Sequence, residues 1–187
     1  ALLGTRNGAN GGPPAQPPPA CLCDPMTDPA PNRPLRLALP KGRMQHNLLQ
    51  LLADAGMPVR LGQRDYRPRV ANTDFDCKLL KPQNVVEMLH QGSRDLGFAG
   101  ADWVRELGFP LVELLDTGLD PVRIVAAAPA AFLESGALPR RRFVVASEYE
   151  VLTRDWLRRC GHEAAFVRSY GATEAFPPDD ADVIVDN

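Results

Sequence analysis

The segment Lys41-Gly42-Arg43 joins an apolar run at 35–39 to an amphipathic stretch that begins at residue 44. A strand followed by a helix fits this pattern. The backbone N–H groups and the dipole at a helix start attract anions, and two flanking cations strengthen that attraction. The segment therefore predicts a phosphate-binding turn, with an ordinary turn bearing solvated charges as the alternative.

A second group of cations lies between residues 64 and 81. Five basic residues fall within these 18 positions, although the whole chain has 21 Lys and Arg against 23 Asp and Glu. Arginine offers paired donors to a phosphate, whereas lysine acts as a point charge. The group predicts a pocket for a polyanionic substrate, unless its members are solvated loop residues. Its members are Arg64, Arg67, Arg69, Lys78 and Lys81.

Acidic residues stand at the predicted ends of two further strands. Gly97 and Gly100 allow a ligand to approach the backbone closely, and Asp102 follows them at the start of a helix. Asp102 could accept hydrogen bonds from a base or a ribose, or it could simply cap the helix. Asp186 ends the last apolar strand, where it could meet a ribose hydroxyl or a metal-bound diphosphate.

No set of metal ligands is predicted. The three histidines lie on separate segments without ligand spacing, and the four cysteines include no C-x-x-C pair. The cysteine pattern does not indicate a disulfide framework, so a reducing compartment is expected.

Short apolar runs alternate with helical stretches from residue 35 onward, which is typical of an α/β fold with largely parallel strands. Asn84 with Glu87, and Ser147 with Glu150, are spaced as helix N-caps with their partners. Strands are expected at 35–39, 58–61, 77–81, 94–100, 111–115, 122–128, 143–146, 164–168 and 181–185.

Composition limits the class of protein. The net charge of −2 argues against a general nucleic-acid or anionic-membrane surface. The longest apolar run, 124–133, is interrupted by Pro129 and is too short to span a membrane.

Residues 1–34 contain 13 Pro and Gly and predict a disordered leader. That leader has no Ser and only two Arg, unlike a transit peptide, so a cytoplasmic location is expected, with a plastid as the alternative.

The order of the motifs along the chain resembles ATP phosphoribosyltransferase, the family that opens histidine biosynthesis. The resemblance covers 35–187 and includes L-P-K-G-R at 39–43, K-P-Q-N-V-V-E-M-L from residue 81, Y-G-A-T-E at 170–174 and A-D-V-I-V-D at 181–186. It implies a two-lobed fold like that of periplasmic binding proteins, with mixed, mostly parallel sheets. The lobes are expected at 35–122, on the nucleotide and diphosphate side, and at 123–187, on the phosphoribosyl side. The fold is expected to be incomplete at its C-terminus, before a phosphate-binding loop.

The resemblance also implies a reaction. Adenine N1 of ATP would attack the ribose C1 of 5-phosphoribosyl-1-diphosphate (PRPP), and diphosphate would leave with Mg²⁺. Lys41, Arg67 and Lys81 would bind phosphate groups, with Lys81 on the diphosphate; Lys81 and Arg67 are the residues expected to act in catalysis. Arg43 and Gly100 are expected to belong to the substrate-binding site.

Four more residues would contact the substrates by this resemblance. Asp102 and Tyr149 would meet the nucleotide, through hydrogen bonding and ring stacking respectively. Glu174 and Asp186 would lie at the ribose of PRPP. A homo-oligomer is expected, with a regulatory subunit in some forms of the family, and no nucleic acid or membrane partner.

The chain departs from the family pattern at Lys81 and Asn84, where the family has an arginine and an aspartate. Lysine keeps the positive charge but loses the paired donors of arginine. The departures leave an alternative function: a non-catalytic module of the same architecture that binds an anionic solute or regulates a partner. The 187-residue chain by itself is expected to turn over poorly or not at all.

Overall fold

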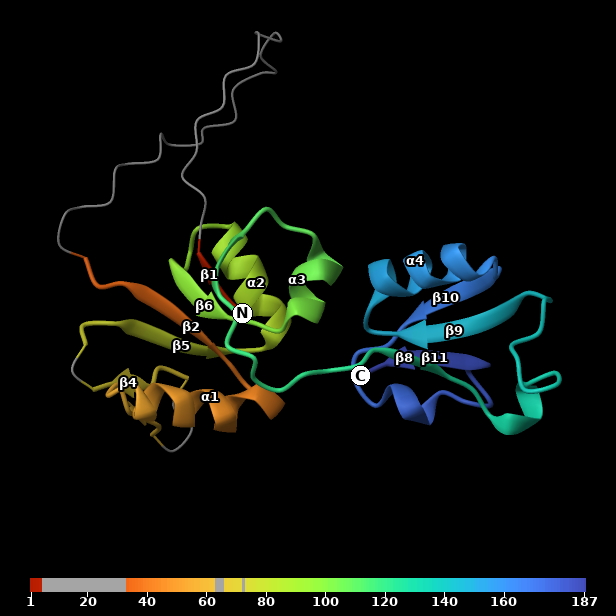
Figure 1. The fold of residues 1–187 in the computed structure, drawn as a ribbon, viewed down its shortest axis with the longest axis horizontal. Helices are drawn as coiled ribbons and strands as arrows, with labels where there is room; N and C mark the ends of the chain where they lie inside the picture. The colour runs from red at the N-terminus through yellow and green to blue at the C-terminus, as the bar shows by residue number, and fades with distance from the viewer. Residues whose placement is uncertain (5–32, 63–65, 72) are drawn as a thin grey trace, which may run out of the picture. The chain divides into compact units, whose positions relative to one another are not determined.

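Strands, single or in short groups, are separated by helices along the chain (Figure 1). The computed structural model describes residues 1–4, 33–62, 66–71 and 73–187. The described residues form two compact units, one drawn from 1–100 and 109–119 and the other from 101–108 and 120–187. The predicted α/β class with mixed sheets is confirmed. The predicted lobes at 35–122 and 123–187 stay a prediction, because compactness does not reveal which substrate each lobe binds.

The first unit is built on a five-stranded sheet in the order β5-β2-β6-β1-β7. Strand β2 pairs in parallel with both β5 and β6, while β1 pairs antiparallel with β6 and β7. The strands are β1 (Leu2–Gly4), β2 (Arg36–Pro40), β5 (Asp76–Leu80), β6 (Leu96–Phe98) and β7 (Val112–Leu115).

Strand β1 corrects the prediction that the first 34 residues are a structureless leader. Leu3 is buried, and the backbone of Ala1 exchanges hydrogen bonds with Ala99. Three residues of this segment therefore gain a place in the sheet from partners distant in the sequence, which local composition does not reveal. Residues 5–32 of the predicted leader lie outside the described residues.

Two helices cover opposite faces of this sheet (Figure 1). Helix α1 (Arg43–Asp54) buries Leu48 and Leu52 in a cluster with Leu37 and Leu39 of β2. Helix α2 (Pro82–His90) buries Val85 and its neighbours Val86 and Leu89. The alternation of side chains along a strand explains this arrangement, because neighbouring residues of β2 face opposite helices.

A separate two-stranded sheet in the first unit joins β3 (Val59–Arg60) to β4 (Arg69–Val70). Val70 belongs to the same apolar cluster as α1. This pair brings residues 66–70 back against β5, where the backbone N–H of Leu79 donates to the carbonyl of Tyr66.

The second unit has a four-stranded sheet in the order β10-β9-β11-β8. Strand β9 pairs in parallel with β10 and β11, and β8 pairs antiparallel with β11. The elements are α3 (Ala101–Leu107), β8 (Val125–Ala127), the 3₁₀ turn η1 (Ala130–Phe132), β9 (Phe143–Ser147), α4 (Glu150–Cys160), β10 (Ala164–Arg168), the 3₁₀ turn η2 (Thr173–Ala175) and β11 (Val183–Asp186). None of the described helices is long and apolar enough to cross a membrane.

The predicted helix starts are corrected by the structure. Helix α2 begins at Pro82 rather than at Asn84, because proline suits the first helical position. The side chain of Asn84 instead donates to Glu87 at 3.0 Å. Helix α4 begins at Glu150, and Glu150 binds Arg154 and Arg168 rather than closing a capping box with Ser147.

Asp95 ties the start of β2 to the start of β6. Its carboxylate accepts two hydrogen bonds from the Arg33 guanidinium, at 2.7 and 2.8 Å, and one from the backbone N–H of Arg36 at 2.9 Å. The Arg36 guanidinium adds contacts at 2.9 and 3.2 Å. Hydrogen bonds from Arg33, followed by those from Arg36, hold the pKa of Asp95 well below its usual range.

We expect Gly97→Ala to destabilise the fold. A Cβ at Gly97 would lie 2.8 Å from Cγ1 of Val85 and 3.1 Å from Cδ1 of Leu89, so α2 would have to move off the sheet. Overpacking of this kind costs about 1–3 kcal/mol. The free energy of unfolding in urea measures it, with Gly4→Ala as the control because its nearest contact would be at 3.4 Å. Equal losses in the two variants would contradict the close packing of α2 on β6.

We expect Asp95→Asn to lower stability near neutral pH by about 1–3 kcal/mol, since it removes a charged acceptor. The depressed pKa of Asp95 means that its ion pairs stabilise the fold above the unfolded-state pKa of about 4. That contribution is lost as pH falls through the lower folded-state value. In thermal melts from neutral to acidic pH, the melting temperature of the variant should therefore change less with pH than that of the wild type. The control variant Asp74→Asn, at an exposed position, should show the wild-type change of melting temperature with pH.

Candidate functional site

The parallel register of β2 and β5 brings the ends of both strands to the same edge of the first sheet. Pro40 stands opposite Leu80, and the backbone N–H of Lys41 donates to the carbonyl of Leu80 at 2.8 Å. Lys41 and Lys81, 40 positions apart in the chain, thus follow two neighbouring strand ends. We call Lys41, Arg67 and Lys81 the basic edge.

Two helices start beside the basic edge. Gly42 precedes α1 with φ of 87°, a left-handed conformation that glycine adopts without strain, and Lys81 precedes α2. Neither helix has a side-chain N-cap or an acidic residue in its first turn. The positive ends of the two helices therefore add to the charges of Lys41 and Lys81, which favours an anion at this edge.

Tyr66 positions the third member of the basic edge. Its carbonyl accepts from Leu79 near the end of β5, and its ring lies 3.5 Å from the Lys41 ammonium nitrogen. Arg67 follows directly and is exposed. Sequence reasoning missed Tyr66, although an aromatic among several cations is the signal for such a contact.

The other cations predicted with this group lie elsewhere. Lys78 is in the middle of β5 and Arg69 is in β4, so neither follows the edge at Leu80. Arg64 lies outside the described residues. Arg43, the first residue of α1, is exposed next to Gly42, so the structure keeps it near Lys41.

A polar cluster forms within the second unit from Asp102, Tyr149 and Asn187. The hydroxyl of Tyr149 donates to Oδ2 of Asp102 at 2.7 Å and accepts from Nδ2 of Asn187 at 2.5 Å. Burial, and then the hydrogen bond to the Asp102 carboxylate, raises the pKa of Tyr149. Tyr149 therefore stays a neutral donor that fixes one oxygen of Asp102.

The structure corrects the stacking role predicted for Tyr149. Its side chain is buried, and its ring centroid lies 4.7 Å from that of Trp103 at an interplanar angle of 34°. The ring packs against Trp103 and has no exposed face on which a base could stack. Tyr149 acts here as a positioning residue for Asp102, and its place in a substrate-binding site stays a prediction.

The strand ends of the second sheet position this cluster. Ser147 ends β9 opposite Val185 of β11; its hydroxyl donates to the Val185 carbonyl at 2.6 Å and accepts from the Tyr149 N–H at 2.9 Å. Asp186 ends β11 and accepts from the backbone N–H of Asn187 at 2.8 Å. Tyr149 therefore lies just after the end of β9, and Asp186 is the last residue of the neighbouring strand β11.

Glu106 is a buried residue that sequence reasoning missed. Its carboxylate accepts from the backbone N–H groups of Val151 and Leu152, both at 3.0 Å, so it caps the start of α4 from α3. Only 5% of Glu106 is exposed. No local spacing could reveal this cap, because its two helices are separated by more than 40 residues.

The remaining predicted residues are less constrained. Glu174 is exposed in η2, and Gly100 is half-buried two residues after the end of β6. Within the described part of the chain, no three His, Cys, Asp or Glu side chains gather to hold a metal ion. The chemistry available here is anion binding at the basic edge and hydrogen bonding at Asp102 and Asp186.

We expect Glu106→Ala to destabilise the second unit by about 1–3 kcal/mol, because two N–H groups of α4 would lose their acceptor. Differential scanning calorimetry measures the change in melting temperature. Asp179→Ala, at an exposed position of the same unit, is the control and should melt with the wild type. An unchanged melting temperature in Glu106→Ala would refute the capping role.

Comparisons with known proteins indicate the family of this chain. A family model described as "HisG: ATP phosphoribosyltransferase" matches residues 81–187. A relative named ATP phosphoribosyltransferase from Chlorobium phaeovibrioides is 34% identical over 160 residues, which cover 83% of this chain and 54% of the relative. One of the same name from Desulforudis audaxviator is 35% identical over 159 residues, covering 81% of this chain and 54% of the relative.

A solved structure shows the same fold. It is titled ATP phosphoribosyl transferase (HisG:HisZ) complex from Thermotoga maritima, with a TM-score of 0.65 at 24% identity, covering 81% of this chain and 73% of that chain. The likeness confirms the predicted fold class, that of the periplasmic binding proteins. The chain spans about half the length of the curated relatives it matches. From the match of the family model over 81–187, the chain belongs to the ATP phosphoribosyltransferase family.

Proposed function

We propose that this chain supplies substrate-binding groups for the first step of histidine biosynthesis, in which N1 of ATP displaces diphosphate from C1 of PRPP to give N1-phosphoribosyl-ATP. The observation that carries the proposal is the placement of Lys41 and Lys81 at two neighbouring strand ends, each beside a helix start. Membership of the family supplies the identity of the reaction.

The basic edge would bind the diphosphate of PRPP. Lys41 and Lys81 would each place an ammonium group near it, and Arg67 would offer the paired donors of a guanidinium. Arg43 would lie beside the same phosphates. Charge builds on the leaving diphosphate in the transition state, so these cations would stabilise that state more than the bound substrate.

Asp102 would accept a hydrogen bond from the nucleotide, with its orientation fixed by Tyr149. Asp186 and Glu174 would lie at the ribose of PRPP, and Gly100 would let the substrate approach the backbone. Adenine N1 already carries a lone pair, so the attack needs alignment more than a strong base. The hydrogen bond that holds Asp102 and the place of Asp186 at the end of β11 support such a positioning role.

Magnesium fits this proposal as an ion that enters with the diphosphate. Mg²⁺ in proteins is often held by substrate phosphates with one or two carboxylates, and it keeps several waters. Asp186 is a half-buried carboxylate at a strand end and is the donor we assign to such an ion. The ion would supply charge neutralisation to the leaving diphosphate.

The substitutions at Lys81 and Asn84 are consistent with a retained but altered diphosphate site. Lys81 keeps a cation at the start of α2, while the Asn84 amide is occupied with Glu87. A regulatory subunit is proposed as a partner, since the structural neighbour is titled a HisG:HisZ complex. Assembly as a homo-oligomer and a cytoplasmic or plastid location stay predictions.

The test is the reaction of the complete protein that contains this chain. We expect product, followed by the ultraviolet absorbance of N1-substituted adenine, only when ATP, PRPP and Mg²⁺ are all present. Lys81→Gln should lower kcat/KM at least tenfold, equivalent to about 1.4 kcal/mol of transition-state stabilisation. Lys78→Gln, in the middle of the strand whose end Lys81 follows, is the matched control and should stay within about twofold.

Two results would contradict the proposal. Absence of product from the folded, complete protein would favour the non-catalytic alternative, particularly if calorimetry shows one bound anion and no release of diphosphate. Equal losses in Lys81→Gln and Lys78→Gln would show that general positive charge, rather than the basic edge, is responsible.

A further inference from the structure

The second unit has a pocket at the end of its sheet opposite to Asp186. Strands β9 and β10 begin at this end, where Phe143 pairs with Ala164, and they finish at the other end, where Ser147 pairs with Arg168. The pocket has a volume of about 380 Å³, within the range of small-molecule sites. Because it lies away from the strand ends described above, it is separate from the polar cluster of Asp102, Tyr149 and Asn187.

The lining is basic although the chain as a whole is acidic. Three arginines line the pocket against one glutamate, Glu163, so its formal charge is +2 with His162 neutral. The arginines come from two segments: Arg142 lies in the loop immediately before β9, and Arg154 and Arg158 lie on α4. The dipole of α4 accounts for a cation at its C-terminal end, but it does not account for Arg142.

The floor and one wall of the pocket are fixed by packing. Leu157 is 6% exposed and belongs to the apolar core of the unit. The ring of His162 lies 5.7 Å from that of Phe143 and 6.3 Å from that of Trp156, so two aromatic neighbours hold it in place. A ligand would therefore meet a preformed apolar base surrounded by charged groups.

The arginines keep donors for a ligand. Nε of Arg154 donates to Glu150, and one terminal nitrogen of Arg158 contacts Asp155. A guanidinium has five N–H donors, so each retains others. Arg142 is exposed and makes no hydrogen bond or ion pair with the residues that the structure describes. Exposed ion pairs such as Arg158 with Asp155 contribute little stability, so an incoming anion competes at small cost.

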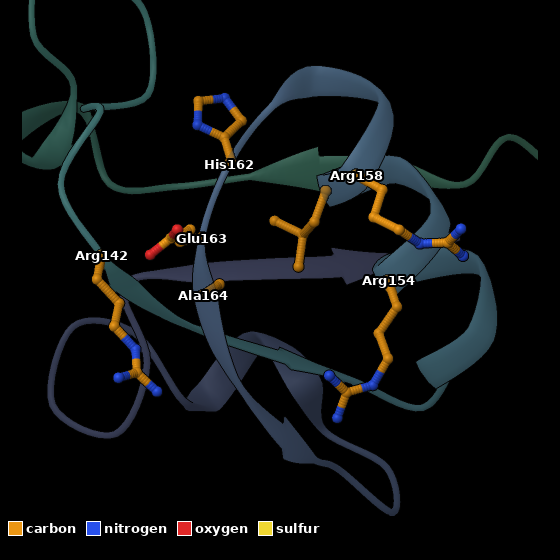
Figure 2. A pocket seen from close by; sticks show the side chains of 7 residues that line it. Arg142, Arg154, Arg158, His162, Glu163 and Ala164 are labelled. Atoms are coloured by element: carbon orange, nitrogen blue, oxygen red, sulfur yellow. The ribbon is translucent and has the colours of Figure 1, made fainter.

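The arrangement of these groups around the pocket indicates the class of ligand. Figure 2 shows Arg142, Arg154 and Arg158 at separate points around the pocket, with their guanidinium groups directed to different sides. Guanidinium groups that point to different sides favour a ligand with more than one anionic group. We propose that this pocket binds a small molecule carrying at least two phosphate groups, at a site independent of the reaction proposed above.

The test uses the 187-residue chain and inorganic tripolyphosphate as the probe, in magnesium-free buffer. The imidazole C–H signals of His162, assigned by comparison with His162→Gln, report on the pocket in NMR titrations. We expect these signals to shift until saturation, and the double variant Arg142→Gln/Arg158→Gln to weaken the affinity at least tenfold. Both substituted residues are exposed, and circular dichroism melts check that the variant folds.

Two control variants separate this site from other positive charge. Arg159→Gln removes a neighbouring cation of α4 that does not line the pocket, and it should leave the affinity within about twofold. Lys41→Gln/Lys81→Gln removes two cations of the basic edge. It should leave unchanged the shift of the His162 signals on addition of tripolyphosphate. A second binding event lost only in that variant would belong to the proposed diphosphate site, so the two proposals fail separately.

Three outcomes would overturn the inference. The His162 signals could stay in place at saturating tripolyphosphate. The Arg159→Gln variant could weaken binding as much as the double variant, which would show diffuse attraction. Finally, poly-glutamate could shift the His162 signals where tripolyphosphate does not, which would assign the surface to an acidic protein partner.

Discussion

The parallel pairing of β2 with β5 is the constraint on which the first unit depends. It sets Pro40 opposite Leu80, so Lys41 and Lys81 and the starts of α1 and α2 reach one edge together. A shift of the register by one residue would turn Leu37 and Leu39 away from α1 and separate the two strand ends. The apolar core and the basic edge are thus products of the same alignment, which explains why a charged site can be held firmly by hydrophobic packing.

The second unit depends on three buried polar side chains, Glu106, Tyr149 and Ser147, whose partners lie far away in the sequence. Glu106 caps α4, and Tyr149 links Asp102 to Asn187, while Ser147 joins the ends of β9 and β11. An unpaired polar group would be costly at such depth, so each partner restricts the others. This network fixes the carboxylate of Asp102 more narrowly than the ordinary rotamers of an exposed aspartate would. Preorganisation of that kind suits a site that aligns substrates rather than one that moves protons.

The net charge of the chain conceals how its charges are distributed. Lys41, Arg67 and Lys81 gather at one edge of the first sheet. In the second unit, Arg142, Arg154 and Arg158 surround a pocket at the end of the sheet where β9 and β10 begin. Acidic residues elsewhere compensate for both groups, so the overall balance stays at −2. Local concentration of cations, and not total charge, is what determines where this protein can hold a small anion.

Much of this protein could be predicted from its sequence: the α/β class, most of the strands and the apolar face of α1. These features depend on local periodicity and on the ordered motifs, which can be recognised in the sequence without knowledge of tertiary contacts. The sequence could not reveal the strand at Leu2–Gly4, the cap from Glu106 or the burial of Tyr149, since each depends on a partner more than 40 residues away. Only the tertiary structure decided these three features. A buried polar group of the backbone or of a side chain pairs with a partner that is near it in the folded chain, and the local spacing of residues does not indicate which partner that is.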